Sequence, residues 1–172
     1  MAGRRLTGIT AERGLPPRLG AVVDGDGVHF SIVSRHADRM ELCLFEGGMT
    51  RENRRLVLPG RQGDVFFGFV PGLQAGALYG YRAYGPWEPA NGHRFDPSKL
   101  LVDPYAIALD RPYAYDPRLS APPDAAVDTA SLVPRAIVTE LPLDATPMPP
   151  GIPGFTYCLL YTSDAADDSL RV

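Results

Sequence analysis

The chain has 172 residues, 45% of them hydrophobic, and a net charge of −3, which fits one globular domain with short extensions. This charge gives no sign of a nucleic-acid footprint, and no apolar run approaches the ~20 residues of a membrane span, so we expect neither a nucleic-acid nor a membrane partner. Only Cys43 and Cys158 are present, and the charged N-terminus precedes no apolar segment, which predicts a cytoplasmic protein without disulfide framework, metal or cofactor.

The first elements read as short strands joined by tight turns. Residues 1–14 are polar and aperiodic, which is typical of a flexible lead-in. A short strand over 20–23 is followed by Asp-Gly-Asp-Gly at 24–27, which predicts a hairpin turn rather than a metal or acid/base pair. Alternating apolar residues then predict a half-buried strand beginning at Val28 and another beginning at Met40, in which Cys43 is a small strand residue and no nucleophile.

Further strands continue the pattern. Residues 56–58 form a short strand, residues 60–64 turn the chain, and alternation resumes from Val65 and again from Leu78. These intervals predict an all-β fold, an immunoglobulin-like antiparallel β-sandwich over 15–110 followed by a Pro-rich extended linker. The positions expected to be largely buried are Phe30, Ile32, Leu42, Leu44, Phe67 and Tyr81.

The stretch from Tyr79 to Ala106 organises the rest of the chain. Its strand places Tyr81 and Tyr84 on opposite faces and ends at Gly85-Pro86. Asn91-Gly92 then predicts a turn, and Asp-Pro-Ser-Lys from residue 96 predicts the start of a short helix.

The same stretch carries a family resemblance. Tyr-Gly-Tyr-Arg-x-x-Gly-Pro and Gly-His-Arg-Phe-Asp-Pro-x-Lys-Leu-Leu-x-Asp-Pro-Tyr-Ala resemble the N-terminal module of isoamylase-type glycogen debranching enzymes, glycoside hydrolases of the alpha-amylase superfamily. The resemblance covers roughly residues 14–138 and is looser before Tyr79. It implies an immunoglobulin-like fold, and a nucleophilic Asp and an acid/base Glu that lie on a separate catalytic (β/α)8 barrel.

The amino-acid composition changes after Ala106. Fourteen of the 18 prolines lie at or after Pro86, so we interpret 111–157 as a linker toward a missing barrel, crossed by one strand at 135–139. Residues 158–172 resemble a translated sequencing adaptor, which predicts a non-native tail on a truncated chain; the alternative is a divergent native tail.

We therefore expect no catalytic residues in this chain. A retaining glycosidase needs two carboxyl groups about 5–5.5 Å apart, and the acids here sit in turns, caps or exposed positions. Two functions remain open: the non-catalytic N-terminal module of a debranching hydrolase, or a stand-alone glycan-binding or interaction module.

Six residues are candidates for the site itself. They would either bind an α-glucan such as glycogen, by stacking aromatic rings on sugars, or dock on the missing barrel, and docking is the favoured interpretation. These residues are Tyr84, Trp87, His93, Arg94, Phe95 and Tyr105.

Overall fold

The computed structural model describes residues 8–14, 16, 18–46 and 50–140. The chain divides into two units, Met1–Glu140 and Leu141–Val172, and the second lies outside the described residues. The predicted tail 158–172, the linker beyond Glu140 and the first half of the predicted lead-in therefore lie outside the described part. The described end of the lead-in is held by the sheet, since Thr10 and Phe69 exchange two backbone hydrogen bonds of 2.9 and 2.7 Å.

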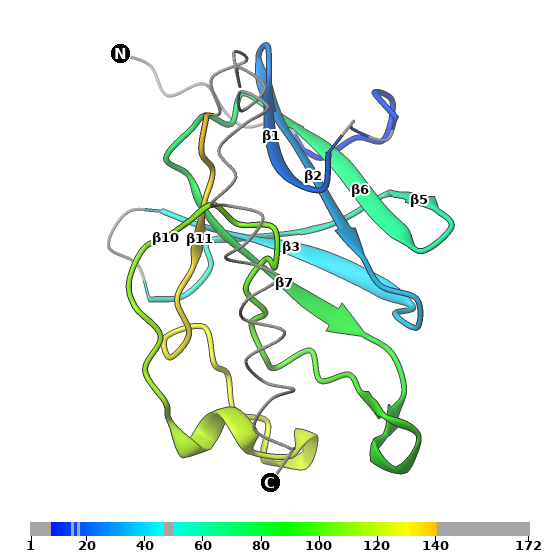
Figure 1. The fold of residues 1–172 in the computed structure, drawn as a ribbon, viewed down its shortest axis with the longest axis vertical. Coiled ribbons are helices and arrows are strands. Elements are labelled where there is room, and N and C mark those ends of the chain that lie inside the picture. The colour runs from blue at the N-terminus through cyan, green and yellow to red at the C-terminus, as the bar shows by residue number, and fades with distance from the viewer. Residues whose placement is uncertain (1–7, 15, 17, 47–49, 141–172) are drawn as a thin grey trace, which may run out of the picture. The chain divides into compact units, whose positions relative to one another are not determined.

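Two antiparallel sheets face each other, which confirms the predicted all-β sandwich (Figure 1). The four-stranded sheet has the order β1-β2-β6-β5. Its strands are β1 (Gly20–Asp24), β2 (Gly27–Val33), β5 (Gly60–Gln62) and β6 (Val65–Pro71). The five-stranded sheet has the order β10-β11-β7-β3-β4. Its strands are β3 (Arg39–Phe45), β4 (Arg54–Val57), β7 (Leu78–Tyr84), β10 (Ala108–Leu109) and β11 (Ala136–Ile137).

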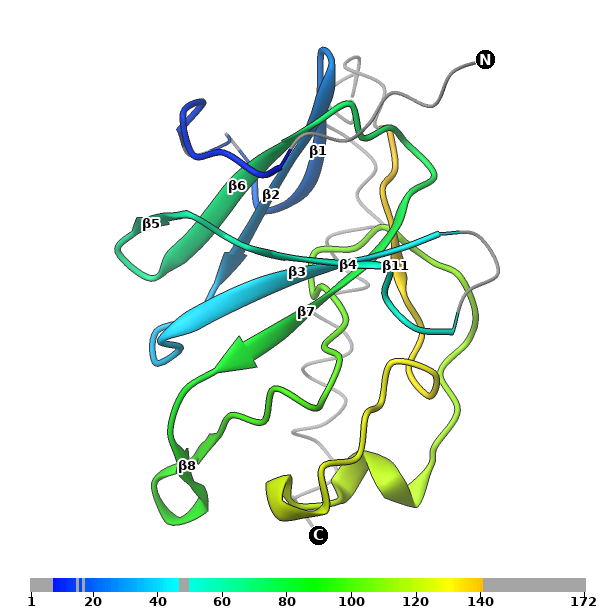
Figure 2. The ribbon, with the colours of Figure 1, turned by 180° about the vertical axis from the view of Figure 1, so that it is seen from behind.

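A two-stranded hairpin forms a third sheet, separate from the other two. Its strands β8 (Trp87–Glu88) and β9 (His93–Arg94) flank the 3-10 turn η1 (Pro89–Asn91), beyond the end of β7 (Figure 2). Two more 3-10 turns follow, η2 (Pro117–Ser120) and η3 (Pro123–Ala125). No helix in the described residues is long and apolar enough to cross a membrane.

The core lies between the two sheets and follows the period of two. All six positions predicted to be buried are at most 8% exposed, which confirms that prediction. The main cluster takes alternate residues from each central strand. These include Val28, Phe30 and Ile32 of β2, Met40, Leu42 and Leu44 of β3, Phe66 and Val70 of β6, and Tyr79, Tyr81 and Ala83 of β7.

Phe67 is buried on the opposite face from the core residues of β6. It pairs with Gly60 of β5, and a Cβ on Gly60 would clash with the Phe67 ring. Residues 60–62, predicted to be part of a turn, are a strand paired with β6, and Gly60 leaves room for the Phe67 ring on the outer face. The turn itself is shorter and centres on Gly63, whose φ of 59° is in the left-handed region.

The segment after β10 returns to the sandwich. β11 lies between β10 and β7, and Ala136 and Val138 belong to the main core. The strand predicted at 135–139 is thus present, two residues long. Leu100, Ala130 and Val133 pack with Cys43 and Phe45 in a second cluster, so this part of the predicted linker packs against the sheet.

The helix predicted from Asp96 is not formed. Asp96 Oδ1 accepts a 2.9 Å hydrogen bond from the backbone N–H of Ser98, and the Lys99 N–H bonds to the Asp96 carbonyl at 3.0 Å. These bonds make a turn that the chain leaves at once, because Leu101 bonds to Tyr81 through both backbone groups at 2.9 and 2.7 Å. Because Leu101 pairs with β7, Asp96 forms an isolated Asx turn in place of the expected helix N-cap.

Candidate functional site

The β8–β9 hairpin presents the single tryptophan. Trp87 pairs with Arg94 and Glu88 with His93, and the Trp87 side chain is 44% exposed. Gly92 closes the turn with a φ of 82°, as the predicted Asn91-Gly92 turn requires. Trp87 thus offers part of its indole surface outside the sandwich core.

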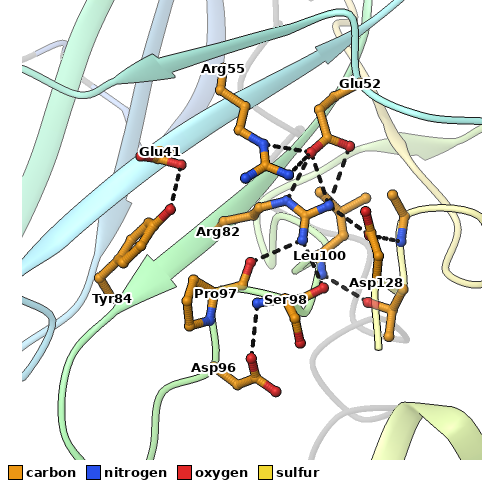
Figure 3. Close-up of polar contacts among 12 residues, drawn as sticks. Glu41, Glu52, Arg55, Arg82, Tyr84, Asp96, Pro97, Ser98, Leu100 and Asp128 are labelled. Atoms are coloured by element: carbon orange, nitrogen blue, oxygen red, sulfur yellow. Dashed lines mark hydrogen bonds and ion pairs between the residues drawn. The ribbon is translucent and has the colours of Figure 1, made fainter. Parts of the chain in front are cut away.

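The hydroxyl and the ring face of Tyr84 both have partners within the fold. Its hydroxyl donates a 2.9 Å hydrogen bond to Glu41 Oε2 (Figure 3), and the Arg39 guanidinium carbon lies 3.7 Å from the ring centroid. Glu41, expected from its strand position to be exposed, is only 8% exposed because of these neighbours. Tyr84 is therefore part of a polar cluster on the outer face of the sheet.

His93 and Phe95 fix the hairpin against its neighbours. The rings of His93 and His36 lie 4.5 Å apart between centroids. The Phe95 ring packs over Gly85, where a Cβ would come within 2.7 Å of it. Gly85 is thus required for close approach, and Phe95 is half-buried against the core.

Tyr105 lies apart from the hairpin. Its side chain is 42% exposed and covers Gly20, whose φ of 92° and close contact with Tyr105 exclude a larger residue. Asp103 supports this loop, since its carboxylate accepts the Tyr79 hydroxyl at 2.7 Å and the Tyr105 N–H at 2.8 Å. Burial raises the pKa of Asp103, and these two hydrogen bonds only partly oppose the rise.

A groove of about 510 Å³ opens between the end of β2, the hairpin and the loop that follows it. Arg94 and Phe95 line it, together with Val33, Asp96, Lys99 and Leu101. Trp87, His93, Tyr84 and Tyr105 are not among its lining residues. The structure therefore brings two of the six predicted site residues into one groove and leaves the other four outside it.

The strongest polar cluster was not predicted from the sequence. Arg82 is 1% exposed, and its guanidinium donates to both oxygens of Glu52 at 3.1 and 3.2 Å and to Asp128 Oδ1 at 2.8 Å (Figure 3). It also donates to the carbonyls of Pro97 and Ser98 at 2.9 and 2.7 Å. The available signal was the place of Arg82 in the middle of a strand of mostly apolar residues, where a charged side chain that becomes buried needs polar partners.

The charges of this cluster stabilise one another. Burial alone would raise the pKa of Glu52, but hydrogen bonds from its own backbone and from Arg82 and Arg55 hold the pKa below its usual value. Burial likewise opposes ionisation of Asp128, whose pKa is lowered by the hydrogen bonds of Arg82 and the Ala130 N–H. Nearby Cys43 has a pKa raised to about 12 by burial, so its thiol is a packing group of β3, in keeping with its predicted role.

Comparison with known proteins places the chain in a family. Residues 18–106 match the family model described as carbohydrate-binding module 48, isoamylase N-terminal domain. A glycogen debranching enzyme of Yersinia enterocolitica is 45% identical over 134 residues, which make up 76% of this chain and 20% of the relative. The chain thus spans about a fifth of the length of that relative.

Solved structures agree on the fold. A product complex of the multi-modular glycogen-degrading pneumococcal virulence factor SpuA aligns with a TM-score of 0.52 and 16% identity, covering 73% of this chain and 12% of that one. The catalytic module of the same protein, bound to an inhibitor, gives a TM-score of 0.52, 16% identity and coverage of 73% and 17%. With the family model spanning more than half of the sequence and the sandwich fold shared, the chain belongs to the carbohydrate-binding module 48 family, the isoamylase N-terminal domains.

Proposed function

We propose that the chain is the non-catalytic N-terminal module of a glycogen debranching enzyme, a hydrolase of α-1,6 branch linkages. The observation that carries this proposal is the 45% identity to a glycogen debranching enzyme over 134 residues. The described acids support it, because those with shifted pKa values serve as partners of Arg82, Arg118, Arg135 or Tyr79 within the fold.

The module contacts the rest of that enzyme through its exposed apolar side chains. Trp87 and Tyr105, both expected to dock, are 44% and 42% exposed, and the segment after Tyr105 adds further apolar surface. These further side chains are Ile107, Leu109, Tyr113 and Tyr115, each at least 44% exposed. The remaining four-fifths of the relative's length supplies the partner.

An assay in trans tests the docking. The Yersinia relative is prepared without the part that matches this chain, and its melting temperature is measured with and without the purified chain. We expect the chain to raise the melting temperature and Trp87→Ser to abolish the rise. Val57→Ser is the matched control, because Val57 is 47% exposed on β4. Equal effects of the two variants would reject the docking surface.

A second assay tests the lack of catalysis. The 172-residue chain alone should release no reducing ends from glycogen or pullulan above a buffer control. Turnover that survives repurification and disappears when one of the chain's own acids is replaced would reject the proposal.

Two further assignments belong to the same proposal. The folding unit extends to Glu140, because Ala136 and Val138 lie in the main core.

The protein is cytoplasmic, because Cys43 is a free, buried thiol and the sequence holds one other cysteine. Fractionation of the native host, with an antibody to this chain, would test the location.

A further inference from the structure

We propose that a polar pocket at the start of β4 binds the phosphate group of a small ligand. The pocket has a volume of about 290 Å³, close to the lower end of the roughly 300–1,000 Å³ of small-molecule sites. None of its residues belongs to the docking side chains around Trp87 and Tyr105, so the site goes beyond the proposed function. The pocket is lined by Arg51, Glu52, Asn53, Arg54, Arg55 and Asp128.

The two carboxylates of the pocket already have cationic partners. Buried Arg82 pairs with Glu52 at 3.0 Å and with Asp128 at 2.8 Å. Arg55 also pairs with Glu52, and its Nε donates to Glu52 Oε1 at 2.6 Å (Figure 3). The Arg55 side chain nevertheless remains 44% exposed. Glu52 therefore orients the Arg55 guanidinium and leaves it further N–H groups for a ligand.

Two further arginines of the pocket have no acidic partner. Arg51 is exposed and Arg54 is half-buried, and neither pairs with a carboxylate of the described residues. The side-chain amide of Asn53 adds a neutral donor. The other two arginines balance the two carboxylates, so the pocket retains two positive charges in a chain whose net charge is −3. Such a pocket attracts an anion with two negative charges.

A phosphate group suits these donors better than a carboxylate does. Its charge is close to −2 at neutral pH, and its oxygens accept from several guanidinium groups at once, often through pairs of parallel hydrogen bonds. The cations also repel one another. Burial and the charge of Arg82 act to lower the pKa of Arg55, whereas Glu52 raises the pKa above its usual value. A bound dianion relieves this repulsion.

The test is titration calorimetry of the full chain at low ionic strength, with inorganic phosphate and glycerol 3-phosphate as probes and acetate as the monoanion control. Replacing Arg51 and Arg54 together by Gln removes the two uncompensated charges. Replacing Arg18 and Arg35 by Gln makes the same change of net charge at exposed residues outside the pocket. Arg51→Gln alone is a milder variant at an exposed position, and circular dichroism melts verify that each protein is folded.

We expect the Arg18 and Arg35 double variant to bind each phosphate probe as the wild type does. The Arg51 and Arg54 double variant should bind roughly tenfold more weakly or less, and Arg51→Gln should lie between. Glycerol 3-phosphate should bind more weakly at pH 5 than at pH 7.5, because its phosphate gains a proton with a pKa of about 6 while the arginines stay charged. Tighter binding of glycerol 3-phosphate than of inorganic phosphate would identify a phosphate monoester as the ligand, and the reverse would identify the free ion.

A wild type that binds neither phosphate probe would overturn the site. Equal losses in the two double variants, acetate binding as tight as phosphate binding, or equal binding at the two pH values would overturn it as well, because each indicates general charge attraction. All of these results leave the docking proposal standing, since that proposal is tested at Trp87 without any added anion.

Discussion

Arg82 and Asp128 are 46 residues apart in sequence, and their side chains meet at 2.8 Å on the outer face of the five-stranded sheet. Arg82 belongs to the central strand β7, whereas Asp128 lies in the segment that the sequence identified as a linker. This ion pair therefore attaches residues 111–140 to the sandwich.

Truncation tests that attachment. A chain ending at residue 110 loses Asp128 together with Ala136 and Val138 of the core, so we expect it to melt far below a chain ending at Glu140. Each deleted core side chain removes about 1–3 kcal/mol of burial, and Arg82 loses a partner. Differential scanning calorimetry of both chains measures the difference. Equal melting temperatures would show that the segment adds nothing to the folding unit.

Removal of Arg82 leaves Glu52 and Asp128 without their shared donor. Arg82→Leu is expected to lower the free energy of unfolding by about 3–5 kcal/mol, as loss of one partner of a buried ion pair does. Arg35→Leu is the control, because its side chain is 75% exposed and its ion pair with Asp64 is worth about 0–1 kcal/mol. Urea denaturation gives both values. A cost for Arg82→Leu no larger than for the control would contradict the assignment.

The same cluster predicts an acid-sensitive fold. The pKa values of Glu52 and Asp128 are lower in the folded chain than in the unfolded chain, so their contribution is complete above the unfolded pKa of about 4. It is lost as the pH falls through the folded values, while Asp103, with its raised pKa, acts in the opposite direction. We expect the free energy of unfolding to fall below about pH 4, less steeply in Glu52→Gln. Identical acid slopes for the two proteins would contradict this.

The contact between Gly85 and Phe95 predicts a steric effect at the hairpin. A Cβ at Gly85 lies 2.7 Å from the Phe95 ring and 3.0 Å from the His36 carbonyl, so Gly85→Ala should cost about 1–3 kcal/mol. Gly8→Ala is the matched control, because its Cβ meets no atom within 4 Å. Thermal melts compare the two, and a neutral Gly85→Ala would contradict the packing.

Cys43 should be almost inert in the native chain. With a pKa of about 12, roughly one thiol in ten thousand is ionised at pH 8, and burial blocks access. In a Cys158→Ser background, we expect alkylation by iodoacetamide to be at least about a hundredfold slower in buffer than in 8 M urea. Similar rates in both conditions would show that Cys43 is open to solvent.

Period-two spacing sufficed to predict the strands and the buried positions, because β2, β3 and β7 each alternate clearly between faces. It failed in β6, where Val65-Phe66-Phe67-Gly68-Phe69 is apolar on both faces and the pattern does not say which phenylalanine faces the core. The spacing of apolar residues also could not predict contacts between segments that are distant in the sequence. Arg82 reaches Asp128, and β11 reaches β7, through pairings that no local pattern encodes.

The place of β11 has a consequence for the order in which the chain folds during synthesis. Among the described strands β10 pairs only with β11, and β11 joins it to β7, so the five-stranded sheet cannot close until Ile137 has left the ribosome. Until then β7 has an open edge beside Leu78 and Tyr79, and the core lacks Ala136 and Val138. At about 5–20 residues per second, the sandwich waits several seconds for its last strand after β7 emerges.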